Sequence, residues 1–84
     1  MHFVYVLYSA STDKYYIGCS SDPESRLKKH LAHHGGYTGR IKDWSICYQE
    51  CFENKIAALA REKQLKGWKS KIRIRQLVEG PNGG

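Results

Sequence analysis

Two tyrosines and an arginine near the start of the chain have side chains suited to phosphate chemistry. Tyr5 and Tyr16 lie in two apolar runs, and Arg26 comes eight residues after Gly18. A guanidinium group grips two phosphate oxygens and stays charged at any relevant pH. A phenol beside such a cation and a metal-bound water can have a lowered pKa and accept the proton of the attacking water. A core tyrosine and a surface arginine are the ordinary structural alternatives.

Glu62 is the most informative carboxylate of the sequence. It lies three residues from both Leu59 and Leu65, which predicts that it faces inward from a helix. Burying a carboxylate is costly unless a partner compensates its charge. Two interpretations stay open: an ion pair with an arginine such as Arg26, or a ligand for a hard divalent cation. Mg²⁺ suits the second, because it keeps several waters and takes only one or two carboxylates.

Histidines form a second set of candidates. His30 follows Arg26 by four residues, one turn along the same predicted helix, and could transfer protons near neutral pH. A solvated helix histidine is the alternative. His30, His33 and His34 have the spacing of half a zinc site, but no acidic residue or cysteine lies nearby in sequence to complete it.

Three segments predict the strands that position these residues. Residues 2–8 form a continuous apolar run, typical of a strand that is buried on both faces. Residues 14–19 form its hairpin partner, and residues 44–52 alternate apolar and polar side chains. Residues 34–43 read as a loop in which Arg40 is available to a ligand.

Helices are predicted between and after these strands. The first covers 23–33, with Asp22 as its cap and Leu27 and Leu31 on its inner stripe. Residues 68–78 fit either a strand or a helix, and we expect a helix.

The middle helix is predicted over residues 55–66. Asn54 caps its start and Gly67 ends it in a left-handed conformation. Ile56, Leu59 and Leu65 mark its core side.

Composition describes one small domain. The chain has 84 residues, 40% of them hydrophobic, and no run approaches the roughly 20 apolar residues of a membrane helix. Residues 1–3 lead into a strand without a signal-peptide pattern. The odd number of cysteines, without a CxxC motif, fits reduced thiols. We therefore expect a single domain over 1–79, a flexible tail over 80–84 and a cytoplasmic location.

The net charge of +6 lies in the last third of the chain. Residues 1–53 hold six basic and six acidic side chains, whereas residues 54–84 hold eight basic and two acidic ones. Such a segment indicates a polyanionic partner, because neutralised phosphates release counterions. A solvated helical face is the alternative. The candidates for substrate binding are Lys14, Gly18, Lys29, Arg40, Lys69, Lys71 and Arg73.

Taken in order, these residues resemble the GIY-YIG nuclease family. Phe3-Val4-Tyr5 is similar to the GIY strand, although Phe3 replaces the glycine, and Tyr16-Ile17-Gly18 matches YIG unaltered. Arg26 follows on the next helix, and Glu62 extends the likeness over nearly the whole chain. The resemblance implies an α+β fold in β-β-α-β-α-α order, a three-stranded antiparallel sheet flanked by about three helices.

The resemblance also implies a DNA endonuclease that uses one Mg²⁺ (or Mn²⁺) held by Glu62. Arg26 would hold the scissile phosphate, and Tyr5 would act as general base while Tyr16 orients water or phosphate. These two roles could be exchanged, and His30 is a further candidate base. A non-catalytic nucleic-acid-binding module with the same fold is the alternative.

The homing endonucleases and the excinucleases of this family carry extra domains that choose the DNA target. A separate targeting protein is therefore a candidate partner, and DNA repair a candidate process. The resemblance implies no oligomeric state.

Overall fold

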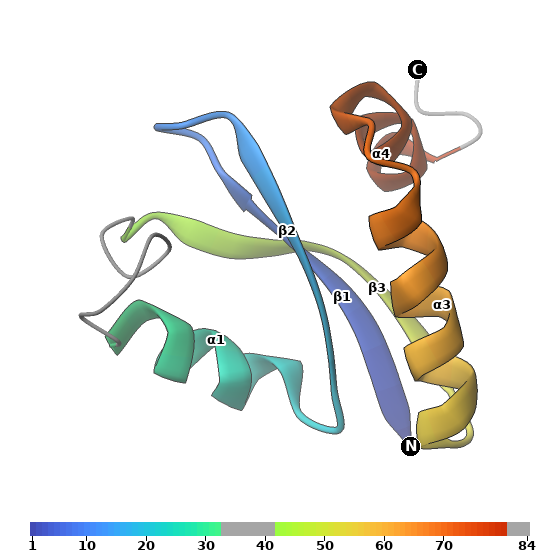
Figure 1. Ribbon diagram of the computed structural model, residues 1–84. Helices are drawn as coiled ribbons and strands as arrows, with labels where there is room; N and C mark the ends of the chain where they lie inside the picture. Colours follow the sequence, from blue (N-terminus) through green and yellow to red (C-terminus); the bar gives the residue numbers. More distant parts are fainter. Residues whose placement is uncertain (33–41, 81–84) are drawn as a thin grey trace.

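Three strands form one antiparallel sheet in the computed structural model, which describes residues 1–32 and 42–80. The strands are β1 (His2–Ser9), β2 (Lys14–Ser20) and β3 (Trp44–Phe52). Their order is β2-β1-β3, so β1 is central and β2 has a free edge (Figure 1). The three predicted strands are confirmed.

Three helices accompany the sheet in the described part of the chain. They are α1 (Pro23–Ala32), α3 (Lys55–Gly67) and α4 (Lys71–Glu79). This α+β arrangement confirms the predicted element order, and the ambiguous segment at 68–78 contains a helix. The capping predictions also hold, because Asp22 Oδ1 accepts from Ser25 N–H at 3.2 Å and Asn54 Oδ1 from Ala57 N–H at 2.8 Å.

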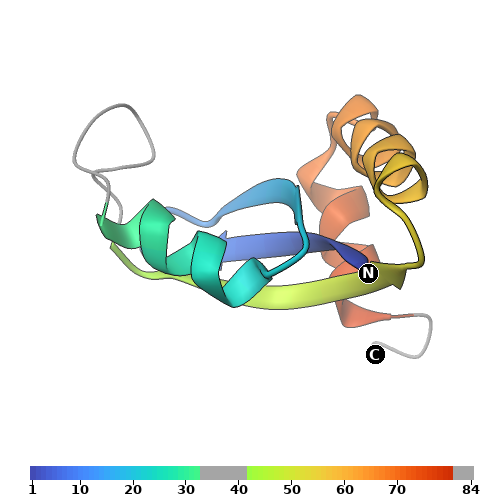
Figure 2. The same ribbon diagram turned by 90° about the horizontal axis from the view of Figure 1, so that it is seen from below.

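Alternating side chains of β1 divide the core between the two faces of the sheet. Val4 and Val6 pack with buried residues of α3 and α4 in one cluster. Tyr5 and Leu7 pack with Trp44 and with the inner leucines of α1 in the other. Figure 2 shows α1 on one side of the molecule and α3 and α4 on the other. The burial of β1 on both faces follows from this arrangement.

The core side of α3 differs from the predicted one. Ile56 and Leu59 are 81% and 42% exposed, whereas Ala58 and Leu65 are buried. Nine residues separate Ile56 from Leu65. That separation is about two and a half helical turns, so the two side chains project from opposite sides of the helix. The predicted burial of Ile56 and Leu59 is therefore wrong.

The end of α3 also differs from the prediction. Gly67 is still helical, and Trp68 keeps right-handed angles (φ −63) while its N–H donates to Leu65 O at 3.2 Å. The left-handed residue is Lys69, with φ 49. Trp68 packs against the core beside α3, which carries the helical conformation past the glycine.

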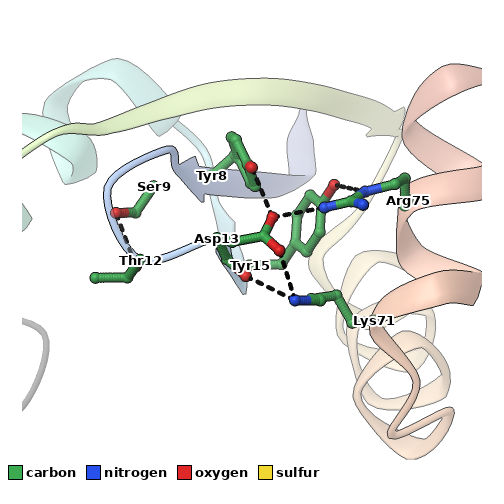
Figure 3. Close-up of polar contacts among 7 residues, drawn as sticks. All are labelled: Tyr8, Ser9, Thr12, Asp13, Tyr15, Lys71 and Arg75. Atoms are coloured by element: carbon green, nitrogen blue, oxygen red, sulfur yellow. Dashed lines mark hydrogen bonds and ion pairs between the residues drawn. The ribbon is translucent and has the colours of Figure 1, made fainter.

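Asp13 joins the β1–β2 turn to α4 (Figure 3). Its carboxylate accepts hydrogen bonds from Tyr8 Oη (2.7 Å), Lys71 Nζ (2.7 Å) and Arg75 Nη2 (2.6 Å). Arg75 Nε also donates to Tyr15 Oη at 3.1 Å. Two elements that lie far apart in the sequence are thereby held together by one carboxylate.

In the part of the chain that the structure describes, none of the helices has the length and apolar character needed to cross a membrane.

The Asp13 cluster generates a prediction about acid stability. Hydrogen bonds from Lys71 and Tyr8 lower the pKa of Asp13 from 3.8 to about 2. A carboxyl whose pKa is lowered by folding stabilises the protein above its unfolded-state pKa, and this contribution disappears as the pH falls through the folded value. We expect α4 to loosen between about pH 4 and 2, and Asp13→Asn to loosen it already at neutral pH.

Amide hydrogen exchange in α4, measured against α1, checks this expectation. Asparagine tolerates the positive φ of 53 at this position, so the substitution tests the charge and not the backbone. Glu24→Gln, in the first turn of α1, is the control with the same change of charge. Equal amide hydrogen exchange of α4 in the unmodified protein and in the Asp13→Asn variant would show that the ion pairs do not hold the helix.

Candidate active site

Tyr5 and Gly18 form the centre of the candidate site. They are direct partners in the β1–β2 register. A Cβ atom placed on Gly18 would lie only 2.5 Å from Cζ and 2.9 Å from Cε1 of Tyr5, closer than real contacts allow. The Tyr5 ring therefore lies across β2 where that strand has no side chain. Gly18 is buried beneath this ring, and its role as a substrate contact stays a prediction.

Arg26 reaches the phenol of Tyr5 from the first turns of α1. The N-terminal end of this helix is fixed by Asp22, whose backbone carbonyl accepts from Arg26 N–H at 3.1 Å. Burial raises the pKa of Tyr5 above 10.0, and a side-chain hydrogen bond from Arg26 partly offsets that increase. In the protein without a metal, desolvation thus outweighs the nearby cation, and the lowering of the Tyr5 pKa beside both Arg26 and a metal-bound water stays a prediction.

Glu62 approaches the same phenol from α3. Its charge raises the pKa of Tyr5, as does the neighbouring Tyr16. The Glu62 side chain is 18% exposed, in agreement with its predicted inward position, and its ion-pair partner is Lys66 at 3.3 Å. The partner is thus a lysine one turn along the same helix, whereas Arg26 was the candidate from the sequence.

The residue beside Glu62 attaches α3 to the sheet. Arg61 donates two hydrogen bonds to the carboxylate of Glu50 on β3, from Nε at 2.9 Å and from Nη2 at 3.0 Å. Tyr48 donates a third hydrogen bond to Glu50 at 2.6 Å. A bidentate guanidinium–carboxylate pair fixes direction as well as distance, so this pair sets where Glu62 lies along the sheet. Arg61 was not among the residues predicted for the site.

Tyr16 and His30 pack together on the α1 face. Their ring centroids lie 5.0 Å apart, and the edge-on ring of Trp44 lies 5.5 Å from His30 and 6.4 Å from Tyr16. Tyr16 keeps 37% of its surface exposed. Trp44 was missed as a residue that supports the site, although the alternation of residues 44–52 already placed it on one face of its strand.

Glu62 is the residue of this site that could hold a metal. Among the described residues, no group of three or more His, Cys, Asp or Glu side chains gathers at one point. A single partly exposed carboxylate suits an ion that keeps most of its waters and takes phosphate oxygens from a substrate. The residues therefore fit Mg²⁺ or Mn²⁺. His33 and His34, which the zinc alternative requires, lie outside the described residues.

Three of the predicted substrate-binding lysines lie together. Lys14, Lys69 and Lys71 line a cleft of about 470 Å³ between β2 and the α3–α4 corner, which we call the lysine cleft. Arg73 instead lies over the ring of Trp68, 4.4 Å from its centroid, on α4.

The other predicted substrate contacts do not join this group. Lys29 is exposed on α1, away from the residues that line the lysine cleft. Arg40 lies outside the described residues.

Comparisons with known proteins agree with this geometry. The model of the GIY-YIG catalytic domain family matches residues 1–76. A UPF0213 protein of Haloquadratum walsbyi is 33% identical over 79 residues, which cover 93% of this chain and 86% of the relative. A UPF0213 protein of Staphylococcus aureus strain Mu3 is also 33% identical over 79 residues, covering 93% and 95%. No solved structure matches significantly.

The contact between Tyr5 and Gly18 predicts the outcome of a double-mutant cycle. Gly18→Ala should reduce the free energy of unfolding by about 1–3 kcal/mol, because the new methyl group overlaps the Tyr5 ring. In a Tyr5→Ala background the same change should cost much less. Urea unfolding of the four proteins measures this coupling.

Gly67→Ala is the matched control. Nothing lies within 4 Å of a Cβ at this helical position. The substitution should therefore be neutral, or stabilising by up to roughly 1 kcal/mol. Identical losses for Gly18→Ala in both backgrounds would contradict the packing of Tyr5 over Gly18.

Proposed function

This chain belongs to the GIY-YIG catalytic domain family, and we propose that it is a metal-dependent endonuclease that hydrolyses DNA phosphodiester bonds. The family match supports a nuclease-type function in general. One observation carries the finer proposal: Arg26 from α1 and Glu62 from α3 both act on the buried phenol of Tyr5. A guanidinium and a carboxylate from two helices thus act electrostatically on a phenol of the central strand.

Arg26 binds the scissile phosphate in this proposal. Its planar guanidinium can donate to two phosphate oxygens and stabilise the negative charge that builds up as water attacks. Arg26 lies near enough to Tyr5 to offset part of the rise in the pKa of the phenol, so the guanidinium is close to the site before substrate arrives. Preorganised donors are effective because they need no rearrangement during the reaction.

Tyr5 orients the attacking water and takes its proton, with Tyr16 or His30 as the alternative acceptor. Since burial raises the pKa of Tyr5, the phenol is protonated in the resting protein at neutral pH. Its proton must therefore leave, or move to a neighbour, as the water is activated. His30 packs against Tyr16 and is the alternative acceptor for the proton of the attacking water.

Glu62 would hold the metal ion. When bound, Mg²⁺ or Mn²⁺ supplies positive charge that stabilises the leaving 3′-oxygen and favours ionised neighbours. Lys66 balances the Glu62 carboxylate in the absence of the ion, at 3.3 Å and with 53% of the lysine side chain exposed. Such an exposed lysine can swing away without a large energetic penalty.

The same ion pair favours a second candidate function. Glu62 already has a cationic partner in Lys66, so the arrangement is also stable without a metal. A non-catalytic nucleic-acid-binding domain with this fold is therefore the alternative. Whether the protein is a nuclease or a binding domain, its DNA target is selected by this domain itself or by a separate targeting protein. A cytoplasmic location and a role in DNA repair stay predictions.

The proposal predicts that Arg26→Lys and Glu62→Gln each lose activity by about a hundredfold or more. Lysine keeps the charge of Arg26 without its fork, and glutamine keeps the shape of Glu62 without its charge. Conversion of supercoiled DNA to its nicked form in Mg²⁺ and in Mn²⁺ measures the loss. Lys63→Gln, on an exposed position of α3, is the control and should keep full activity.

DNA affinity and stability separate catalysis from folding. Glu62→Gln should keep its DNA affinity in EDTA and change the free energy of unfolding by only about 0.5 kcal/mol, because an i,i+4 ion pair whose lysine is half exposed contributes little. Nicking by Arg26→Lys within two- to threefold of the unmodified protein would remove Arg26 from the catalytic role. DNA binding without nicking in either metal would favour the binding domain.

A further inference from the structure

The lysine cleft has an apolar floor. It lies between the free edge of β2 and the corner where α3 ends and α4 begins, and its volume is about 470 Å³. Tyr15 and Ile17 of β2, Leu65 of α3 and Ile74 of α4 line it, and all four belong to the same apolar cluster. The volume falls within the roughly 300–1,000 Å³ typical of small-ligand sites. A flat organic group could therefore be buried here.

Positive charge surrounds this floor. Lys14, Lys66, Lys69 and Lys71 all line the cleft, and no acidic residue is among the described residues that do. Lys66 and Lys71 have carboxylate partners outside the lining, at 3.3 and 2.7 Å, yet their side chains stay 53% and 49% exposed. Lys69 is exposed, and it is the residue with left-handed backbone angles in the α3–α4 turn. An apolar floor inside a lysine rim suits a flat apolar ligand attached to anionic groups.

We propose that the lysine cleft binds an unpaired nucleotide of the DNA strand beside the cut, an inference that rests on the proposed nuclease function for its choice of polymer. A paired nucleotide keeps its base stacked inside the duplex and presents only phosphates, so it has nothing to fill an apolar cleft. An unpaired nucleotide presents a π-face for the floor and flanking phosphates for the lysines. The substrate class is therefore DNA with at least one unpaired nucleotide.

The cleft and the candidate active site share two of their residues. Tyr16 borders the cleft at the edge strand, while its ring packs against His30 on the α1 face. Lys66 lines the cleft and pairs with Glu62, one turn earlier on α3. One DNA strand can therefore contact both places. A peptide strand paired to the edge of β2 is a different occupant, but four lysines favour a polyanion over a neutral backbone.

The test uses a duplex with one unpaired 2-aminopurine and a fully paired duplex of the same length. Binding to the full chain is measured in EDTA, so the readout does not depend on cleavage. We expect about tenfold tighter binding of the DNA with the unpaired base, and a change in 2-aminopurine emission as the base enters the cleft. Equal affinity for the two duplexes would overturn the proposal.

Lys69→Asn tests the rim, because asparagine removes the charge and tolerates the positive φ. It should reduce the preference for the unpaired base about fivefold and lower the salt slope by about one. Lys63→Gln, on α3 but outside the cleft lining, should change neither quantity. If Lys69→Asn weakened binding to both duplexes equally, the cleft would be only a general phosphate contact, and the proposal would be overturned.

Nicking in Mg²⁺ is measured in parallel, so that the two proposals can fail separately. Preference for the unpaired base without nicking would support the cleft and contradict the nuclease. Nicking without that preference would contradict the cleft alone.

Discussion

The Tyr5 ring can lie across β2 only because residue 18 has no side chain. This contact takes a phenol from the central strand and places it near the edge of the sheet. There it meets Arg26, on the helix that follows the same edge strand, and the charge of Glu62, on the helix against the opposite face. Without the crossing, the tyrosine would be an ordinary core residue under α1. The candidate site thus depends on a missing side chain as much as on those present.

The strands and caps could be predicted because their signals are local. The apolar run of residues 2–8 is hydrophobic on both faces, and the structure buries both faces of its centre. Asn54 caps α3 with an oxygen that depends only on the next three residues. The candidate site residues could be proposed because they follow one another in the order of the family's motifs. Their mutual geometry required the register that pairs Tyr5 with Gly18.

Features that depend on distant partners could not be predicted. The apolar side chains of α3 predicted a core-facing side that included Ile56. In the structure, Ala58 and Leu65 are the buried residues of the helix, and Ile56 is exposed. Gly67 was predicted to end the helix, but the next residue, Trp68, packs against the core and keeps helical angles. Similarly, a count of charges treats the basic residues of the last third as free. In the fold, Arg61 is paired with Glu50 and Arg75 with Asp13. Lys66 and Lys71 of the lysine cleft also have carboxylate partners, so the count overstates the positive charge that is left without a partner.

The Asp13 cluster has a consequence for how the chain folds. Its ion pairs close loops of 58 and 62 residues, because Asp13 lies in the first turn whereas Lys71 and Arg75 lie on the last helix. Long loops are slow to close, and contacts of this separation form late. On a ribosome, the β1–β2 hairpin emerges first and must wait for α4 before its turn gains these partners. The final assembly step and the completion of the lysine cleft are therefore the same event.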